Sequence, residues 1–157
     1  MKEQNKAKIQ LHSQYIKDLS FENPNAPQSL AQIAKNPNIG FNVNVNANKL
    51  NENYFEVSLD IKASAKESED EQKIIFQIEL LYSSIFSISD YENEDELKKI
   101  LLIEAPQLIF PFARRIIADA TRDGGFPPLI MDPIDFRKLT EKNEQNNSDK
   151  ETDPNKH

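Results

Sequence analysis

The segment Tyr54–Lys66 alternates apolar and polar side chains along its whole length, and this alternation constrains the fold more than any other feature. Its apolar members are Phe55, Val57, Leu59, Ile61, Ala63 and Ala65. Because successive side chains of a β-strand point to opposite faces, a period of two predicts a long strand with one buried face. A half-buried strand of this kind is typical of antiparallel sheets, whose apolar face needs a cover.

Three more segments carry the same signal. Phe41–Asn48 places an asparagine after each apolar residue, and Ile74–Ile88 is a longer run of the same kind. Ile9–Phe21 is a weaker case, because Ser13 and Lys17 interrupt its expected apolar face of Ile9, Leu11, Tyr15, Leu19 and Phe21. We therefore expect four strands.

Polar or proline-rich segments separate these strands. Glu67–Glu71 predicts a hairpin loop, and Asn48–Asn53 predicts a turn. Asn23–Pro27 breaks regular structure, so the stretch from there to Asn38 is expected to be a long crossover.

The second half of the chain has helical character. Asn93 and the acidic residues after it suit a helix N-terminus. Apolar residues follow with roughly helical spacing: Leu97, Ile100, Leu101, Leu108, Phe112, Ile116 and Ala120. Pro106 and Pro111 are expected to kink this helix, which Gly124-Gly125 ends. Asp132 is expected to cap a second, short helix with Pro133 in its first turn.

Strands followed by helices predict an α+β fold: a four-stranded antiparallel sheet, a long proline-kinked helix and a short C-terminal helix. The length of 157 residues suits one domain, expected over residues 8–141. Residues 1–7 and 142–157 are expected to be disordered tails, because the C-terminal one lacks large apolar side chains. Two helices are scant cover for four long strands, so we expect other copies of the chain to supply part of it.

Composition excludes several classes of function. The absence of cysteine rules out disulfides and thiolate chemistry, and a net charge of -7 argues against nucleic acid and anionic lipid as partners. No apolar run is long enough to span a bilayer, and no secretory signal opens the chain, so we expect a cytoplasmic protein without direct membrane insertion.

Catalytic, metal and cofactor sites are not expected. His12 and His157 are far apart and lack further ligands at suitable spacing. Gly124-Gly125 does not join a strand to a helix in a nucleotide-binding pattern. No carboxylate sits beside a plausible nucleophile, so the expected role is not that of an enzyme.

Several local strings, in their order along the chain, resemble the SecB family of bacterial protein-export chaperones. The resemblance runs from about Leu11 to Leu139, and its strings are Tyr15–Glu22, Pro24–Pro27, Ser84–Ile88, Ala105–Arg114, Gly124–Leu129 and Pro133–Phe136. It implies a homotetramer, a dimer of dimers, without enzymatic activity, nucleotide or cofactor. It also implies an ATP-independent holdase that binds unfolded secretory precursors and delivers them to the SecA motor.

The resemblance also implies two surfaces. A client-binding groove would be lined by Ile39, Phe41, Val43, Phe126, Leu129 and Leu139. A SecA contact would use Asp18, Glu22, Gln77 and Glu79. Two departures from the family pattern stand out: Gln77 replaces an apolar residue, and the last helix loses its apolar face after Leu139.

Other readings stay open from the residues alone. Alternating residues such as Phe41 and Val43 are usually core, and surface carboxylates are usually only solvated. A SecB-like chaperone dedicated to one partner, such as an antitoxin, is an alternative function. An α+β enzyme is a more distant alternative, since it would need a convergent polar pocket.

Overall fold

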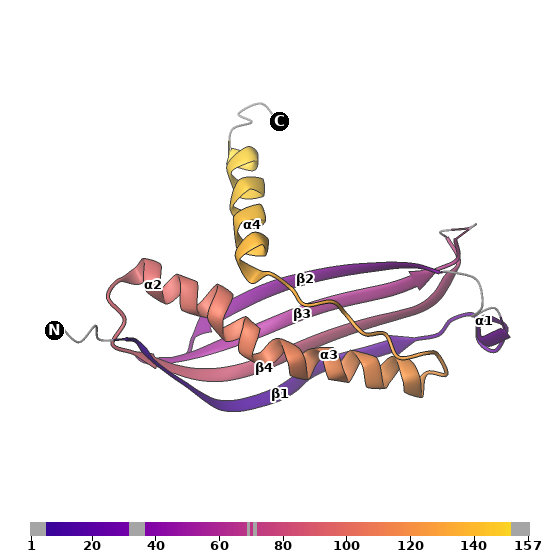
Figure 1. Ribbon diagram of the computed structural model, residues 1–157, viewed down its shortest axis with the longest axis horizontal. Helices are drawn as coiled ribbons and strands as arrows, with labels where there is room; N and C mark the ends of the chain where they lie inside the picture. Colours follow the sequence, from indigo (N-terminus) through magenta and orange to yellow (C-terminus); the bar gives the residue numbers. More distant parts are fainter. Residues whose placement is uncertain (1–5, 32–36, 69, 71, 152–157) are drawn as a thin grey trace.

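The computed structural model describes residues 6–31, 37–68, 70 and 72–151. Its strands are β1 (Lys8–Glu22), β2 (Asn38–Lys49), β3 (Tyr54–Lys66) and β4 (Ile74–Ser89). They form one antiparallel sheet in the order β1-β4-β3-β2 (Figure 1). The four-stranded antiparallel sheet predicted from the alternation is confirmed, and β3 has the predicted bounds.

The connection from β1 to β2 carries the chain from one edge of the sheet to the other. It contains the short helix α1 (Gln28–Ala31). The side-chain amide of Asn25 donates to the carbonyl oxygen of Ile74 at 2.8 Å, and the Ser29 hydroxyl donates to Asn23 Oδ1 at 2.7 Å. The first bond fastens the crossover to the beginning of β4, and the second holds the crossover together.

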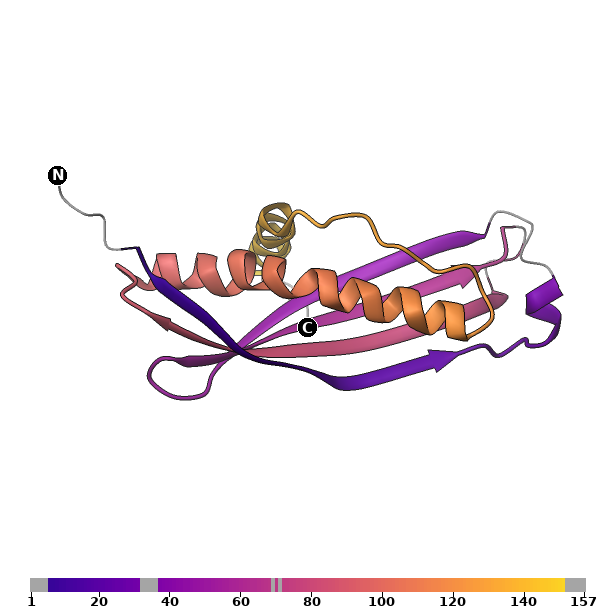
Figure 2. The same cartoon turned by 60° about the horizontal axis from the view of Figure 1, so that its bottom comes forward.

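A helical rod covers one face of the sheet. It consists of α2 (Glu94–Lys99), the π-helical turn η1 (Ile100–Glu104) and α3 (Ala105–Asp123) (Figure 2). The side chain of Asn93 accepts from the Glu96 amide at 2.9 Å, which confirms the predicted start of the helix. The wider π turn ends two residues before Pro106, a residue without an N–H to donate. The kinks expected at Pro106 and Pro111 stay a prediction.

The rod ends where the sequence predicts. Gly125 has a φ of 94°, a left-handed conformation that glycine adopts without strain. Gly124 packs so tightly on Phe21 that an added Cβ would lie 2.3 Å from its ring. Residues 124–135 connect α3 to α4 and are called the connector here. The Thr121 hydroxyl accepts from the Leu129 amide at 2.9 Å and holds the connector against α3.

The last helix, α4 (Phe136–Glu151), differs from the expectation at both ends. Its N-terminal amides of Arg137 and Lys138 bond to Asp135 Oδ1 at 3.0 and 3.3 Å, so Asp135 caps the helix instead of Asp132. The helix also continues beyond Glu141, where a disordered tail was expected. Glu, Gln and Lys are good helix formers even without an apolar face. Residues 1–5 and 152–157 of the expected tails lie outside the described residues.

The core lies between the sheet and the rod. The inward side chains of β3 and the even-numbered inward side chains of β4 are buried, and Ile109, Ala113 and Ile117 of α3 cover them. The buried stripe of α3 is therefore one residue away from the expected stripe. Leu108 and Phe112, two members of the apolar series at helical spacing, are exposed, whereas Ile109 and Ala113 face the sheet.

Candidate functional site

The inner face of the sheet is covered at its centre and open along β2. Register places Phe41 opposite Ala63 and Val43 opposite Ile61, so these β2 residues face the same side as the core. Phe41 is nevertheless 46% exposed, whereas Val57 of β3 is 0% exposed. Ile39 is exposed as well, and Val43 is half-buried. The structure thus brings Ile39, Phe41 and Val43 into one open apolar row.

The other expected groove residues lie elsewhere. Phe126 is buried in an aromatic cluster, with its ring centroid 4.9 Å from that of Phe76 and 6.4 Å from that of Phe21. Leu129 is buried in the connector. Leu139 is half-buried and lines a cleft of about 160 Å³ with Val45 and Leu102. The six residues therefore do not form a single exposed groove in this structure.

A larger cleft of about 590 Å³ separates α4 from α2 and η1. Its lining mixes both charges: Asp95, Lys98, Lys99, Ile103, Glu104, Arg137, Thr140, Glu141 and Glu144. Lys98 Nζ lies 3.0 Å from Glu144 Oε1 across this cleft. The balanced lining favours neither an anion nor a cation.

Further exposed apolar residues lie on β1 and on α3. Ile16 and Leu19 are opposite Tyr82 and Leu80 and so face inward, yet both are exposed. Leu108 and Phe112 form an exposed i, i+4 pair on α3. An α-helix that has apolar side chains on two faces usually packs against protein on both of those faces. Helical spacing alone does not separate these exposed residues from the buried stripe of α3, so they were not predicted as a surface.

β1 carries two β-bulges, which correct its expected face. The register shifts between Leu11 and Ser13 and again between Ile16 and Asp18. Each extra residue reverses the side to which the following residues point. Tyr15, which was expected to share a face with Leu11 and Leu19, therefore lies on the outer face, opposite Ser83.

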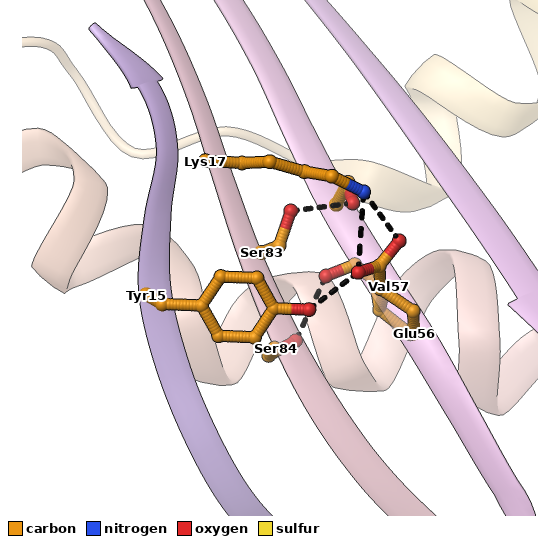
Figure 3. A network of polar contacts seen from close by, with 7 residues as sticks. Tyr15, Lys17, Glu56, Val57, Ser83 and Ser84 are labelled. Carbon is orange, nitrogen blue, oxygen red and sulfur yellow. Dashed lines mark hydrogen bonds and ion pairs between the residues drawn. The ribbon is translucent and has the colours of Figure 1, made fainter. Parts of the chain in front are cut away.

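On that outer face Tyr15 reaches across β4 to β3. Its hydroxyl donates to the Glu56 carboxylate, and Lys17 Nζ lies 3.0 Å from Glu56 Oε1 (Figure 3). Small side chains lie beneath this contact, where the hydroxyls of Ser58 and Ser83 bond at 2.8 Å. Burial, with the adjacent Glu56, raises the pKa of Tyr15 to about 12. The hydrogen bond from Tyr15, aided by Lys17, lowers the pKa of Glu56.

The expected SecA-contact residues do gather on the outer face. Strand register gives one row of Asp18, Leu81 and Asp60 and a second row of Ser20, Glu79 and Lys62. A third row consists of Glu22, Gln77 and Ser64. Gln77 Nε2 donates to Glu79 Oε1 at 3.5 Å. Asp60 belongs to the same surface and was missed, although its place on the polar side of β3 was readable from the alternation.

The described residues offer neither a metal site nor a membrane-spanning helix. Within them, no three histidine or acidic side chains group closely enough to hold a metal ion. None of the helices in the described part of the chain is long and apolar enough to cross a bilayer.

The sequence is similar to that of known proteins over most of its length. A family model described as "Preprotein translocase subunit SecB" matches residues 2–147. The protein-export protein SecB of Mesorhizobium japonicum is 53% identical over 127 residues, which span 81% of this chain and 74% of that protein. The SecB of Rhodopseudomonas palustris strain BisB5 is 50% identical over 131 residues, spanning 83% and 80% respectively.

A solved structure shares the fold. It is a SecB-like chaperone of Mycobacterium tuberculosis in complex with an antitoxin peptide, with a TM-score of 0.62 and 15% identity. The similarity covers 80% of this chain and 90% of that one.

Proposed function

The chain belongs to the SecB family, and on that premise we propose a role for each of its exposed surfaces. It is a chaperone of the Sec protein-export pathway, as its relatives of about 50% identity are. In our proposal it is an ATP-independent holdase of the cytoplasm that keeps unfolded precursors translocation-competent. It performs no reaction on them.

The open row of Ile39, Phe41 and Val43 carries this proposal. Burying a large apolar side chain contributes about 1.5–3 kcal/mol, so two side chains that are nearly half exposed offer about 1 kcal/mol each. Several weak apolar contacts of this size hold an unfolded chain without selecting one sequence. In this proposal an unfolded client lies along β2 on the inner side of the sheet.

The remaining groove residues take supporting roles. Phe126 and Leu129 are buried, so we assign them to the floor beneath the client and not to its surface. Leu139, half-buried beside Val45, marks the end of the groove at α4. The apolar face of α4 stops there, which shortens the groove on that side.

The outer face is the proposed contact for SecA. Asp18, Glu22 and Glu79 present carboxylates beside Gln77. Long-range attraction between these carboxylates and a basic partner accelerates association and weakens with salt. Replacing Asp18 and Glu22 by alanine is expected to weaken SecA binding and to leave the residual binding less sensitive to salt, as measured by calorimetry.

We further propose that four copies assemble as a dimer of dimers. The exposed pairs Ile16 with Leu19 and Leu108 with Phe112 supply apolar area that one copy leaves uncovered. A C2 contact would bury the same patch on both partners. Light scattering at micromolar concentration should give the tetramer mass, and Leu108→Asp should lower it; a monomer for the unaltered chain would refute the assembly.

An aggregation assay tests the holdase itself. The chain should suppress aggregation of a denatured precursor without nucleotide, near one tetramer per client. Phe41→Ser should weaken suppression, whereas Asn42→Ser, on the same strand but the opposite face, should not. Suppression confined to a single partner would favour a dedicated chaperone, and the absence of suppression would contradict the proposal.

A further inference from the structure

We propose that Leu81 is the apolar centre of the docking surface on the outer face of the sheet, with Asp60 as a further carboxylate of that surface. The surface fits a folded protein that presents lysine or arginine side chains around an apolar contact. The inference rests on the proposed function, in which that protein is SecA, and it names residues that decide the strength and salt dependence of the complex.

The register supplies the geometry. Asp18 of β1, Leu81 of β4 and Asp60 of β3 are consecutive in one row across three strands. Neighbouring strands lie about 4.8 Å apart, so the backbones of the two aspartates are roughly 10 Å apart with the leucine between them. All three side chains point to the outer face, and Leu81 is half-buried between its neighbours.

The rod, the connector and α4 lie on the opposite side of the sheet (Figure 2). Within the part of the chain that the structure describes, no helix covers the outer face at Leu81. A leucine in the middle of a polar sheet face therefore has no partner of its own chain above it. An apolar centre inside a polar rim is the usual anatomy of a protein–protein interface.

In a second row on the same face, the carboxylate is already paired with side chains of its own chain. Ile85 of β4 also lies beside a carboxylate of β3, that of Glu56. Glu56, however, is already bonded to Tyr15 and to Lys17 (Figure 3). This carboxylate has no need of an outside cation.

The Leu81 row differs in this respect. Among the described residues, Asp18, Glu22 and Asp60 have no ion pair and no side-chain hydrogen bond. Lys62 lies opposite Glu79 in the next row without forming an ion pair, and Lys66 borders the same hollow as Gln77. Two lysines therefore stand against four carboxylates on this half of the face, which leaves it acidic. These unpaired carboxylates favour a basic partner. Leu81 marks the point at which that partner would make apolar contact.

The test is SecA binding by the full-length chain, measured by calorimetry at low and at moderate salt. Leu81→Gln should weaken binding about tenfold with an unchanged salt dependence, since a central apolar anchor acts mainly on dissociation. Asp60→Asn should weaken it about threefold at low salt and should flatten the salt dependence. Ile85→Gln is the matched control, about 13 Å along the same strand, and should bind as the unaltered chain does.

Thermal unfolding of each variant separates a loss of contact from a loss of fold. If Leu81→Gln is destabilised, Asp60→Asn still tests the surface, because an exposed-face carboxylate is not needed for packing. Normal SecA binding by both variants, together with weak binding by Asp18→Ala with Glu22→Ala, would overturn this inference and leave the proposed function standing. No SecA binding by the unaltered chain would overturn both.

Discussion

The central strand β3 and the edge strand β2 have the same alternating sequence pattern but differ in how deeply their apolar side chains are buried. In both, alternate apolar side chains face the inner side of the sheet. Those of β3 are buried beneath the rod, whereas Ile39 and Phe41 of β2 stay exposed. The alternation of a strand therefore reveals which face is apolar, and the position of the strand in the sheet decides whether its own chain covers that face. In our proposal the uncovered part binds other polypeptides.

The largest expected difference between the two strands is in stability. Leu59→Ala should lower the free energy of unfolding by about 3 kcal/mol, because it removes a fully buried side chain and leaves a cavity. Phe41→Ala should lower it by less than about 1 kcal/mol, because nearly half of that ring already contacts water. Urea unfolding at equal protomer concentration measures both, and equal losses would contradict the distinction.

The next largest difference is expected in the affinity for unfolded client proteins. Phe41→Ala should weaken binding of an unfolded precursor about fivefold, or about 1 kcal/mol, because the exposed ring is part of the contact. Asn42→Ala is the matched control, since its side chain points to the other face of the same strand. Competition between a fluorescent and an unlabelled unfolded chain reads the affinity. Equal behaviour of the two variants would show that clients do not lie along β2.

The other edge strand, β1, offers a smaller effect. Tyr15 and Lys17 tie this strand to Glu56 of β3 across β4 (Figure 3). Tyr15→Phe should lower stability by about 1 kcal/mol, the usual net contribution of a hydrogen bond, as read from urea unfolding at pH 7. A matched change at Tyr54, whose side chain is exposed near the end of the same face, should have a smaller effect.

The same contact gives a pH dependence with a definite sign. The pKa of Tyr15 is raised from 10.0 to about 12, so its stabilising contribution is intact below pH 10 and is lost as the pH rises toward 12. The pKa of Glu56 is lowered from 4.5, so its contribution is intact above that pH and is lost as acid lowers the pH through the folded-state value. Tyr15→Phe should flatten the alkaline limb of the stability profile and Glu56→Gln the acid limb; unchanged limbs would contradict the coupling.

The smallest effect is expected at α4. Lys98 and Glu144 form an exposed ion pair between this helix and α2. Lys98→Ala should change the free energy of unfolding by less than about 0.5 kcal/mol, since water and salt screen such pairs. A loss well above 1 kcal/mol would mean that α4 contributes to the core more than its contacts indicate.

The sequence predicted the architecture well where a single period governs a segment. The alternation gave all four strands, and Asn93 and Gly125 marked the ends of the rod. The sequence-based prediction was wrong where a shift of one residue changes the face to which a side chain points. The bulges in β1 moved Tyr15 to the outer face, and the buried stripe of α3 begins one position from the expected one. Bulges depend on the pairing of two distant strands, which no local pattern reports.

The site was predicted in part for a related reason. The resemblance named ten residues, but only the register shows that Asp18, Glu79 and Gln77 share a surface with Asp60 and Leu81. Burial of Phe126 by Phe21 and Phe76 depends on three segments far apart in the chain. Apolar residues can be recognised in a sequence, whereas their exposure is a property of the packed chain.

Hydroxyl-radical labelling of side chains, with and without an unfolded precursor, tests the central claim most directly. Phe41 should react readily in the assembled protein alone and should become protected when the precursor is added, while Phe55 of β3 should stay unreactive in both states. If Phe41 is already protected without a precursor, or stays reactive when one is bound, the open row of β2 is not where clients are held.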